Sequence, residues 1–430
     1  MNQFLTLFYI YIFLEGILRK WVMPGVPGSL LYGIKYVLLV AIAIFYIARK
    51  QTGMKAIVTP ASRAYIWYAL IVVLSGIAIT GVYNGLIPGV ITIIQYVSPL
   101  ILISTVPQWI NTPKKLNRFL ICGAIIAAGC LILAIVQYAS PPNAIINKYA
   151  MEMKNGIAKV GDAARICSVF SYITPFGDFC LVTVAFSALL LSLKSKKVMR
   201  VLLMALLVLG ILGCVMTGSR SVVLLGSLYI VGIGIYQGLY KGNWSLLLAF
   251  TVIAIGAVIY YNVKGIVAVD NFLLRVDQAS GDVDTRLRRT FDISRMFAYS
   301  GAFGNGAGIA NTSVQSMLLH HSEVDWEEEI GRVMIEFGFI GFIAITFIRV
   351  YVWMYMLRLW KSMHHRYYST LSLATVIVIT PMTFYIQMCL YNWFAYMVYF
   401  TMIGLNIAIS RLDREKSNGK VNQEQTLSFR

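Results

Sequence analysis

The chain has 430 residues, of which 59% are hydrophobic and 13% are charged, and its mean hydropathy is +0.74. Soluble domains carry about 25% charged residues and cannot bury this much apolar surface. The apolar runs continue over about 18 residues or more, unlike the alternating strands of a transmembrane barrel. Composition excludes both classes and predicts an all-α, polytopic membrane protein of about 12 transmembrane helices.

Twelve apolar segments are expected to cross the membrane, at about 3–19, 30–48, 64–83, 87–106, 118–139, 167–193, 200–218, 221–240, 245–263, 333–357, 367–386 and 390–410. The connections on one side of these spans hold 15 Lys and Arg residues and no acidic residue, whereas the other side mixes both signs. The positive-inside rule makes the basic side cytoplasmic and places both termini there. Most of the net charge of +18 is therefore a topology signal and not a nucleic-acid footprint.

The predicted layout is a single integral-membrane domain, residues 1–410, followed by a polar cytoplasmic tail, residues 411–430. A long, partly helical outer loop, residues 264–332, separates spans 9 and 10. The N-terminus lacks a basic region and a cleavage site, so the first segment is expected to be a retained span. The six cysteines lack metal or disulfide spacing and are expected in the core. No metal-ligand pattern or nucleotide fingerprint is present, and we expect neither a metal nor a cofactor.

Charged residues inside the predicted spans need a polar environment. Lys35, Asp178 and Glu336 are expected to face the bundle interior or an aqueous cavity. Arg349 lies near the inner end of its span, where its side chain can snorkel to the interface.

Cations on the outer side run against the positive-inside trend. Ser219 and Arg220 lie in a tight turn, Thr-Gly-Ser-Arg-Ser, between two apolar runs, and Arg19 and Lys20 end the first span beside Trp21. Each set is either an interfacial anchor or a group of donors suited to phosphate.

A second basic cluster lies in the long outer loop. Arg286 and Arg289 are spaced i and i+3 on a predicted helix that runs to about residue 299, and a glycine-rich loop, residues 301–308, follows it. The helix is either a solvated charged surface or an anion cradle. Such a loop allows close approach to a ligand, although glycine loops are common.

Next along the chain come candidate proton acceptors. His320 and His321 can serve as general bases near neutral pH, although a surface histidine pair is more often inert. The acidic run that follows includes Glu328, which is spaced to form a salt bridge with Arg332 at the start of span 10.

In these segments the sequence resembles the O-antigen ligase and O-antigen polymerase superfamily of bacterial envelope glycan assembly. The 217–221 turn looks like that family's Ser-Arg-Gly/Ser turn, and the stretch from Arg165 to Phe179 looks like its Arg-x-x-Gly/Ser-x-Phe segment. The order of Arg286, the glycines at 304 and 306 and a following histidine is similar to its catalytic outer loop. Glu336-Phe-Gly-Phe-Ile-Gly resembles the Glu-x-Gly-x-x-Gly start of its next span. The family's Asn after the histidine is missing here, and residues 323–329 form an acidic insert.

The resemblance implies an inverting, metal-independent glycosyltransferase of the bacterial cytoplasmic (inner) membrane. It would polymerise polyprenyl-diphosphate-linked oligosaccharide repeat units at the outer face, building a lipopolysaccharide or exopolysaccharide. A ligase that transfers the glycan to lipid A-core or another acceptor is the first alternative, and a lipid-linked oligosaccharide flippase is the second. Expected partners are the lipid-linked oligosaccharide, a glycan acceptor, membrane lipid and a chain-length regulator, but no nucleic acid.

The same resemblance suggests roles for individual residues. Charge develops on the departing diphosphate, so arginines there would stabilise the transition state, and one base must deprotonate the acceptor hydroxyl. Diphosphate binding is assigned to Arg220, Arg286 and Arg289. The base is His321, His320 or Glu328, with support from Ser219, Arg165, Arg332 and Glu336.

Overall fold

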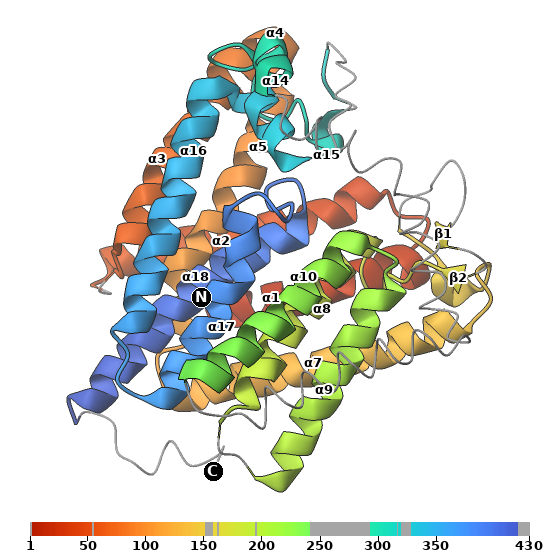
Figure 1. Cartoon of the computed structure of the whole chain (residues 1–430). Helices are drawn as coiled ribbons and strands as arrows, with labels where there is room; N and C mark the ends of the chain where they lie inside the picture. The colour runs from red at the N-terminus through yellow and green to blue at the C-terminus, as the bar shows by residue number, and fades with distance from the viewer. Residues whose placement is uncertain are drawn as a thin grey trace.

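The computed structural model describes residues 2–53, 56–150, 158–160, 163–193, 196–240, 293–315, 317–319 and 328–419. Its helices are α1 (Asn2–Ile17), η1 (Leu18–Val22), α2 (Gly28–Gln51), α3 (Pro60–Leu74), η2 (Ser75–Gly81), α4 (Val82–Asn84), α5 (Leu86–Val97), η3 (Ser98–Ile101), α6 (Leu102–Trp109), α7 (Pro113–Ala139), η4 (Ile145–Asn147), α8 (Ile173–Leu190), α9 (Lys197–Met216), α10 (Arg220–Ile235), η5 (Tyr236–Tyr240), α14 (Ile293–Ser300), α15 (Thr312–Gln315), α16 (Glu329–Lys361), α17 (Arg366–Thr383) and α18 (Trp393–Ser417). One short antiparallel pair, β1 (Lys159–Val160) with β2 (Ala163–Ala164), is the sheet that the described residues contain. Figure 1 shows the helices packed as a bundle.

Within the described ranges, nine helices are long and apolar enough to cross a membrane, which supports a polytopic α-helical membrane protein. They are Gly28–Gln51, Pro60–Gly81, Leu86–Trp109, Pro113–Ala139, Ile173–Leu190, Lys197–Met216, Arg220–Gly238, Glu329–Lys361 and Trp393–Ser417. Each matches a predicted segment. The predicted segments at 3–19 and 367–386 are the helices α1 and α17, which are not among the nine. Segment 245–263 lies outside the described residues.

The centre of the bundle is α18, which is almost entirely buried and packs against α6, α8, α16 and α17. Helices α8, α9 and α10 pack against one another, and α9 also packs on α7. Peripheral helices expose large apolar side chains such as Val37, Trp67, Val201 and Phe347. An extensive exposed apolar surface of this kind fits contact with lipid rather than water. Five cysteines are buried, but Cys122 is exposed, so the expectation that all six lie in the core is wrong for that residue.

Helix α16 is bent back on itself at Gly338, whose φ of 69° is not helical. Arg349 Nη2 lies 2.6 Å from Glu329 Oε1, although the two residues are 20 positions apart. On a straight helix that separation corresponds to about 30 Å. The helix therefore has a short arm, residues 329–337, and a long arm, residues 339–361, and the predicted segment 333–357 includes parts of both.

The glycine-rich loop 301–308 closes this bend. Two backbone N–H groups of the loop, Asn305 and Gly306, donate to carbonyls of the short arm at 2.8 and 3.1 Å. Two N–H groups of the long arm, at Phe339 and Ile340, donate to loop carbonyls at 3.2 and 3.1 Å. A Cβ on Gly304 would lie 2.4 Å from the Gly338 nitrogen. The loop thus replaces the hydrogen bonds that the helix loses at its bend, which buried backbone groups require.

Candidate functional site

The Arg165 segment and the Arg220 turn lie together. Arg165 Nε donates to the Thr217 carbonyl at 2.9 Å. The Thr217 hydroxyl accepts from the Ser219 N–H at 3.1 Å, and the Ser219 and Ser221 hydroxyls are 3.2 Å apart. These bonds fix the turn between α9 and α10. Arg220 is the first residue of α10 and is half-buried.

Residues 165–172 form a buried loop, although the sequence predicts that the span begins at about 167. Ser168 has a φ of 49°, which is uncommon for a residue with a side chain. Its N–H donates to Gln137 Oε1 at 2.8 Å, and its hydroxyl donates to the Cys130 carbonyl at 2.7 Å. Its own carbonyl accepts from Gln137 and from the Lys20 ammonium. Such over-determined backbone strain is typical of functional segments.

A buried cluster of charges lies against this loop. We call Glu15, Arg19, Lys20 and Lys35 the N-terminal cluster. Glu15 binds Arg19 through one oxygen and Lys35 through the other, each at 3.1 Å. Arg19 also reaches the Ser171 hydroxyl at 3.5 Å.

Helix α1 continues into this cluster without a break. Its Gly16 has no side chain, and a Cβ there would lie 2.0 Å from the Val169 carbonyl oxygen. Lys20, in the π-helical turn η1, points its ammonium at the Ser168 carbonyl and lies 3.5 Å from the Cys167 thiol.

Lys35 is enclosed by aromatic rings. Its ammonium lies 3.2 Å from the Tyr32 ring centroid and 3.6 Å from that of Trp393. This geometry adds cation–π attraction to the Glu15 ion pair. The expectation that Lys35 faces the bundle interior is confirmed, because its exposed fraction is 0%.

Residues 384–392, here called the interhelical loop, connect α17 to α18. They contact both α8 and the start of α16. The side-chain amides of Gln387 and Asn392 both donate to the buried carboxylate of Asp178 on α8. The backbone N–H groups of Cys389 and Leu390 donate to Glu329 at the start of α16. Burial of Asp178 confirms its predicted inward orientation.

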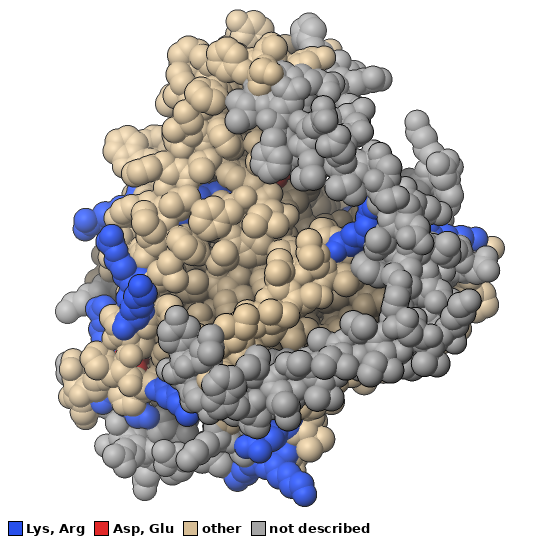
Figure 2. Space-filling view, in the orientation of Figure 1, with Lys and Arg blue, Asp and Glu red and all other residues tan. Residues whose placement is uncertain are grey.

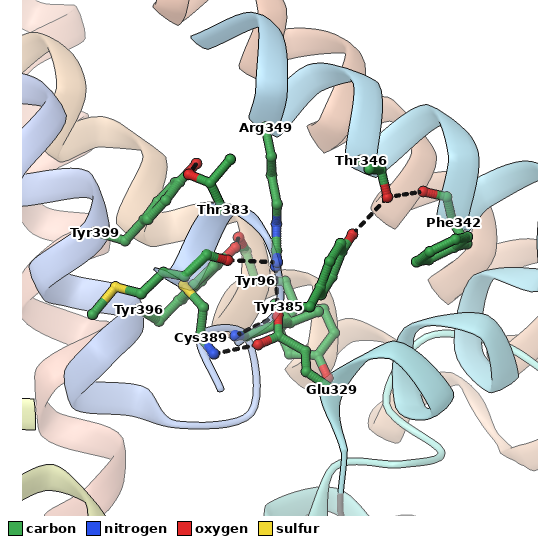
Figure 3. Close-up of polar contacts among 12 residues, drawn as sticks. Tyr96, Glu329, Phe342, Thr346, Arg349, Thr383, Tyr385, Cys389, Tyr396 and Tyr399 are labelled. Carbon is green, nitrogen blue, oxygen red and sulfur yellow. Dashed lines mark hydrogen bonds and ion pairs between the residues drawn. The ribbon is translucent and has the colours of Figure 1, made fainter. Parts of the chain in front are cut away.

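The buried ion pair Glu329–Arg349 lies on the other side of this loop. Figure 3 shows Arg349 reaching from the long arm of α16 toward Glu329, with Cys389 at the same carboxylate. Arg349 also donates to the Met382 carbonyl at 3.3 Å, and its guanidinium carbon lies 4.5 Å from the Tyr385 ring centroid. The interpretation of Arg349 as a snorkelling residue is wrong, because its side chain is 5% exposed and ion-paired.

Glu336 is fully buried near the bend, as expected. Its Oε1 accepts from the Ala310 N–H at 3.0 Å and from the Tyr96 hydroxyl at 3.2 Å. Arg332 donates to the Ala310 carbonyl at 3.3 Å, and its guanidinium lies 5.4 Å from the Tyr391 ring centroid. Both charged residues therefore hold the end of the glycine-rich loop against α16.

The structure thus groups the predicted site residues into two sets. Arg165, Ser219 and Arg220 lie around one turn, while Arg332 and Glu336 lie at the α16 bend. Glu328 is the residue before α16, where its carbonyl accepts from the Arg332 N–H at 3.3 Å. Four predicted site residues lie outside the described residues: Arg286, Arg289, His320 and His321.

Sequence reasoning missed the interhelical loop and the Glu329–Arg349 pair. The loop appeared only as the gap at 387–389 between two apolar segments. One signal was present, namely two amide side chains, Gln387 and Asn392, in a short connection between long apolar runs. Buried amides need hydrogen-bond partners, and the carboxylate of Asp178, predicted to be buried, needs donors. This match could have indicated that the two amides bind Asp178.

Figure 2 shows lysine and arginine side chains along the left and lower rim of one face and a smaller group at the right. Within the described ranges, no three His, Cys, Asp or Glu side chains are grouped so that they could hold a metal ion. No protein-family model matches the chain. No curated protein matches it either.

Proposed function

We propose that the chain is a membrane glycosyltransferase that polymerises polyprenyl-diphosphate-linked oligosaccharides at the outer face of the bacterial cytoplasmic membrane. The observation that carries the proposal is the bond from Arg165 to the carbonyl of Thr217. It joins two segments, far apart in sequence, that both carry the family resemblance: the turn of Arg220, assigned to diphosphate binding, and the segment of Arg165, assigned a supporting role. Arg220 follows directly in that turn and begins α10.

The chemistry requires little beyond charge and one base. A sugar diphosphate is already activated, so its departure is favoured by cations placed where negative charge develops. We assign that role to Arg220, together with Arg286 and Arg289. His321, His320 or Glu328 removes the proton from the acceptor hydroxyl. The reaction then needs neither a metal nor a nucleotide.

The test uses purified full-length protein in detergent and the lipid-linked repeat unit isolated from the host cells, with a metal chelator present. Products are separated on a gel. Arg220→Ala should lower the rate by about 100-fold or more, as for loss of one transition-state donor. Arg200→Ala is the matched control, because Arg200 is exposed at the opposite end of the neighbouring helix α9.

Each outcome has a definite meaning. A ladder of products, lost only in Arg220→Ala, supports a polymerase. Transfer that appears only when lipid A-core is added makes the protein a ligase with the same chemistry. Full activity of Arg220→Ala contradicts the assigned role, and no product with either acceptor contradicts the enzyme.

A further inference from the structure

The N-terminal cluster contains more buried cations than carboxylates. The cluster has three cations and one carboxylate: Arg19 and Lys35 bind Glu15, while Lys20 binds the Ser168 carbonyl. Of the ion pairs between described residues, Glu15 forms two, and none involves Lys20. Lys20 is 1% exposed and Lys35 is 0% exposed. Buried charge without a counter-ion is unfavourable in a membrane protein and marks functional positions.

Arg19 has donor capacity left over. One of its terminal nitrogens binds Glu15, but its Nε is buried and has no hydrogen-bond partner. Its side chain is 12% exposed, so it is not fully enclosed. Helix α2 packs closely against the guanidinium, because a Cβ at Gly28 would lie 2.9 Å from Arg19 Nη2. A guanidinium nitrogen without a partner is suited to a phosphate oxygen.

The N-terminal cluster and the Arg220 turn both contact the 165–171 loop. Arg19 contacts Ser171 and Lys20 contacts Ser168, while Arg165 of that loop contacts Thr217. Residues 165–171 thus connect the N-terminal segment directly to the turn.

We propose that Arg19 and Lys20 form a binding site for a phosphate-class anion on the 165–171 loop. The anion supplies the negative charge that the cluster lacks. Two sources have this chemistry: the diphosphate of a polyprenyl lipid and the phosphate of an anionic membrane lipid. The first source rests on the proposed function, and the second does not.

The experiment measures binding rather than transfer. Full-length protein in phosphatidylcholine nanodiscs is titrated with inorganic pyrophosphate, undecaprenyl diphosphate or phosphatidylglycerol, each in turn. The double variant Arg19→Gln, Lys20→Gln is compared with Arg49→Gln, Lys50→Gln. That control is the same dipeptide and the same charge change, but Arg49 and Lys50 are exposed at the far end of α2. The first variant should bind about tenfold or more weakly, and the control should match the wild type.

A variant that preserves both charges controls for misfolding of the double Gln variant. Arg19→Lys, Lys20→Arg keeps both cations and should restore most of the affinity if the double Gln variant is unstable. Loss for pyrophosphate and undecaprenyl diphosphate supports the diphosphate source, and loss for phosphatidylglycerol alone supports the lipid headgroup. Equal affinity of the Arg19/Lys20 variant and the wild type for all three probes overturns the site, as does a wild type that binds none of them.

The same binding data separate this proposal from the proposed function. If the variant loses binding and the wild type shows no transfer, the anion site is supported and the proposed enzymatic function is contradicted. If the wild type shows transfer and the variant binds as well as the wild type, the enzymatic function is supported and the anion site is contradicted.

Discussion

Glu15 and Glu329 are both buried carboxylates, but they are paired differently. Glu329 receives one arginine and two backbone N–H groups. Glu15 binds two cations, and a third, Lys20, binds the Ser168 carbonyl instead of a carboxylate. A balanced pair fixes a fold, whereas surplus cations leave capacity for a ligand. The charge substitutions below separate these two roles, and the glycine substitutions test the bend that Glu329 and Arg349 hold.

The largest effect is expected for Arg349→Met. This variant leaves Glu329 buried and without a cation, at a cost of about 3–5 kcal/mol in unfolding free energy. Thermal and denaturant unfolding in detergent measure it, with Arg358→Met, an exposed site on the same helix, as the control. Adding Glu329→Gln to Arg349→Met should recover much of the loss. Equal stability of the single and double variants would show that the charge pairing is not what holds the bend.

The next effect concerns the bend itself. Gly304 has a φ of +80°, and a Cβ there would lie 2.4 Å from backbone. Gly301 has a φ of +59°, but nothing lies within 4 Å of its would-be Cβ. Gly301→Ala should therefore cost about 1 kcal/mol from backbone strain alone. Gly304→Ala should cost about 3 kcal/mol, because the loop and helix must also separate. Similar losses in the two variants would contradict the close packing at Gly338.

Apolar patterning was sufficient to place most of these elements, but not the bend. The nine spans follow from continuous apolar runs, and the turn before Arg220 follows from a short polar interruption between two of them. Burial of Lys35, Asp178 and Glu336 followed from their position inside apolar runs. These features depend on local composition, which the sequence displays directly.

The missed features depend on tertiary contacts. Hydropathy is the same for a straight and a bent apolar segment, so the run from 333 to 357 gave no sign of the turn at Gly338. The bend exists because the 301–308 loop supplies replacement hydrogen bonds. The pairing of Glu329 with Arg349 follows from that bend. Helical spacing could not indicate it, since neighbours on a straight helix lie three or four residues apart.

A smaller effect is expected for Lys35→Met in the N-terminal cluster. Glu15 keeps its bond to Arg19, and methionine fills the space between the Tyr32 and Trp393 rings. The expected cost is about 1–2 kcal/mol, from the lost ion pair and cation–π contacts. Unfolding measured beside Arg349→Met tests the comparison directly. A loss as large as that of Arg349→Met would mean that the N-terminal cluster has no surplus of cations.

The smallest stability effect is expected for Arg19→Gln. Glu15 keeps its ion pair with Lys35 at 3.1 Å, so no buried carboxylate is left without a cation. The unfolding free energy should therefore fall by about 1 kcal/mol or less. Pyrophosphate affinity should nevertheless fall about tenfold, because the guanidinium edge is lost. A residue that holds the fold would show the reverse, with a large loss of stability and unchanged affinity. Arg19 thus provides the sharpest contrast with Arg349, because both bind a buried carboxylate but only Arg19 has a buried Nε without a partner.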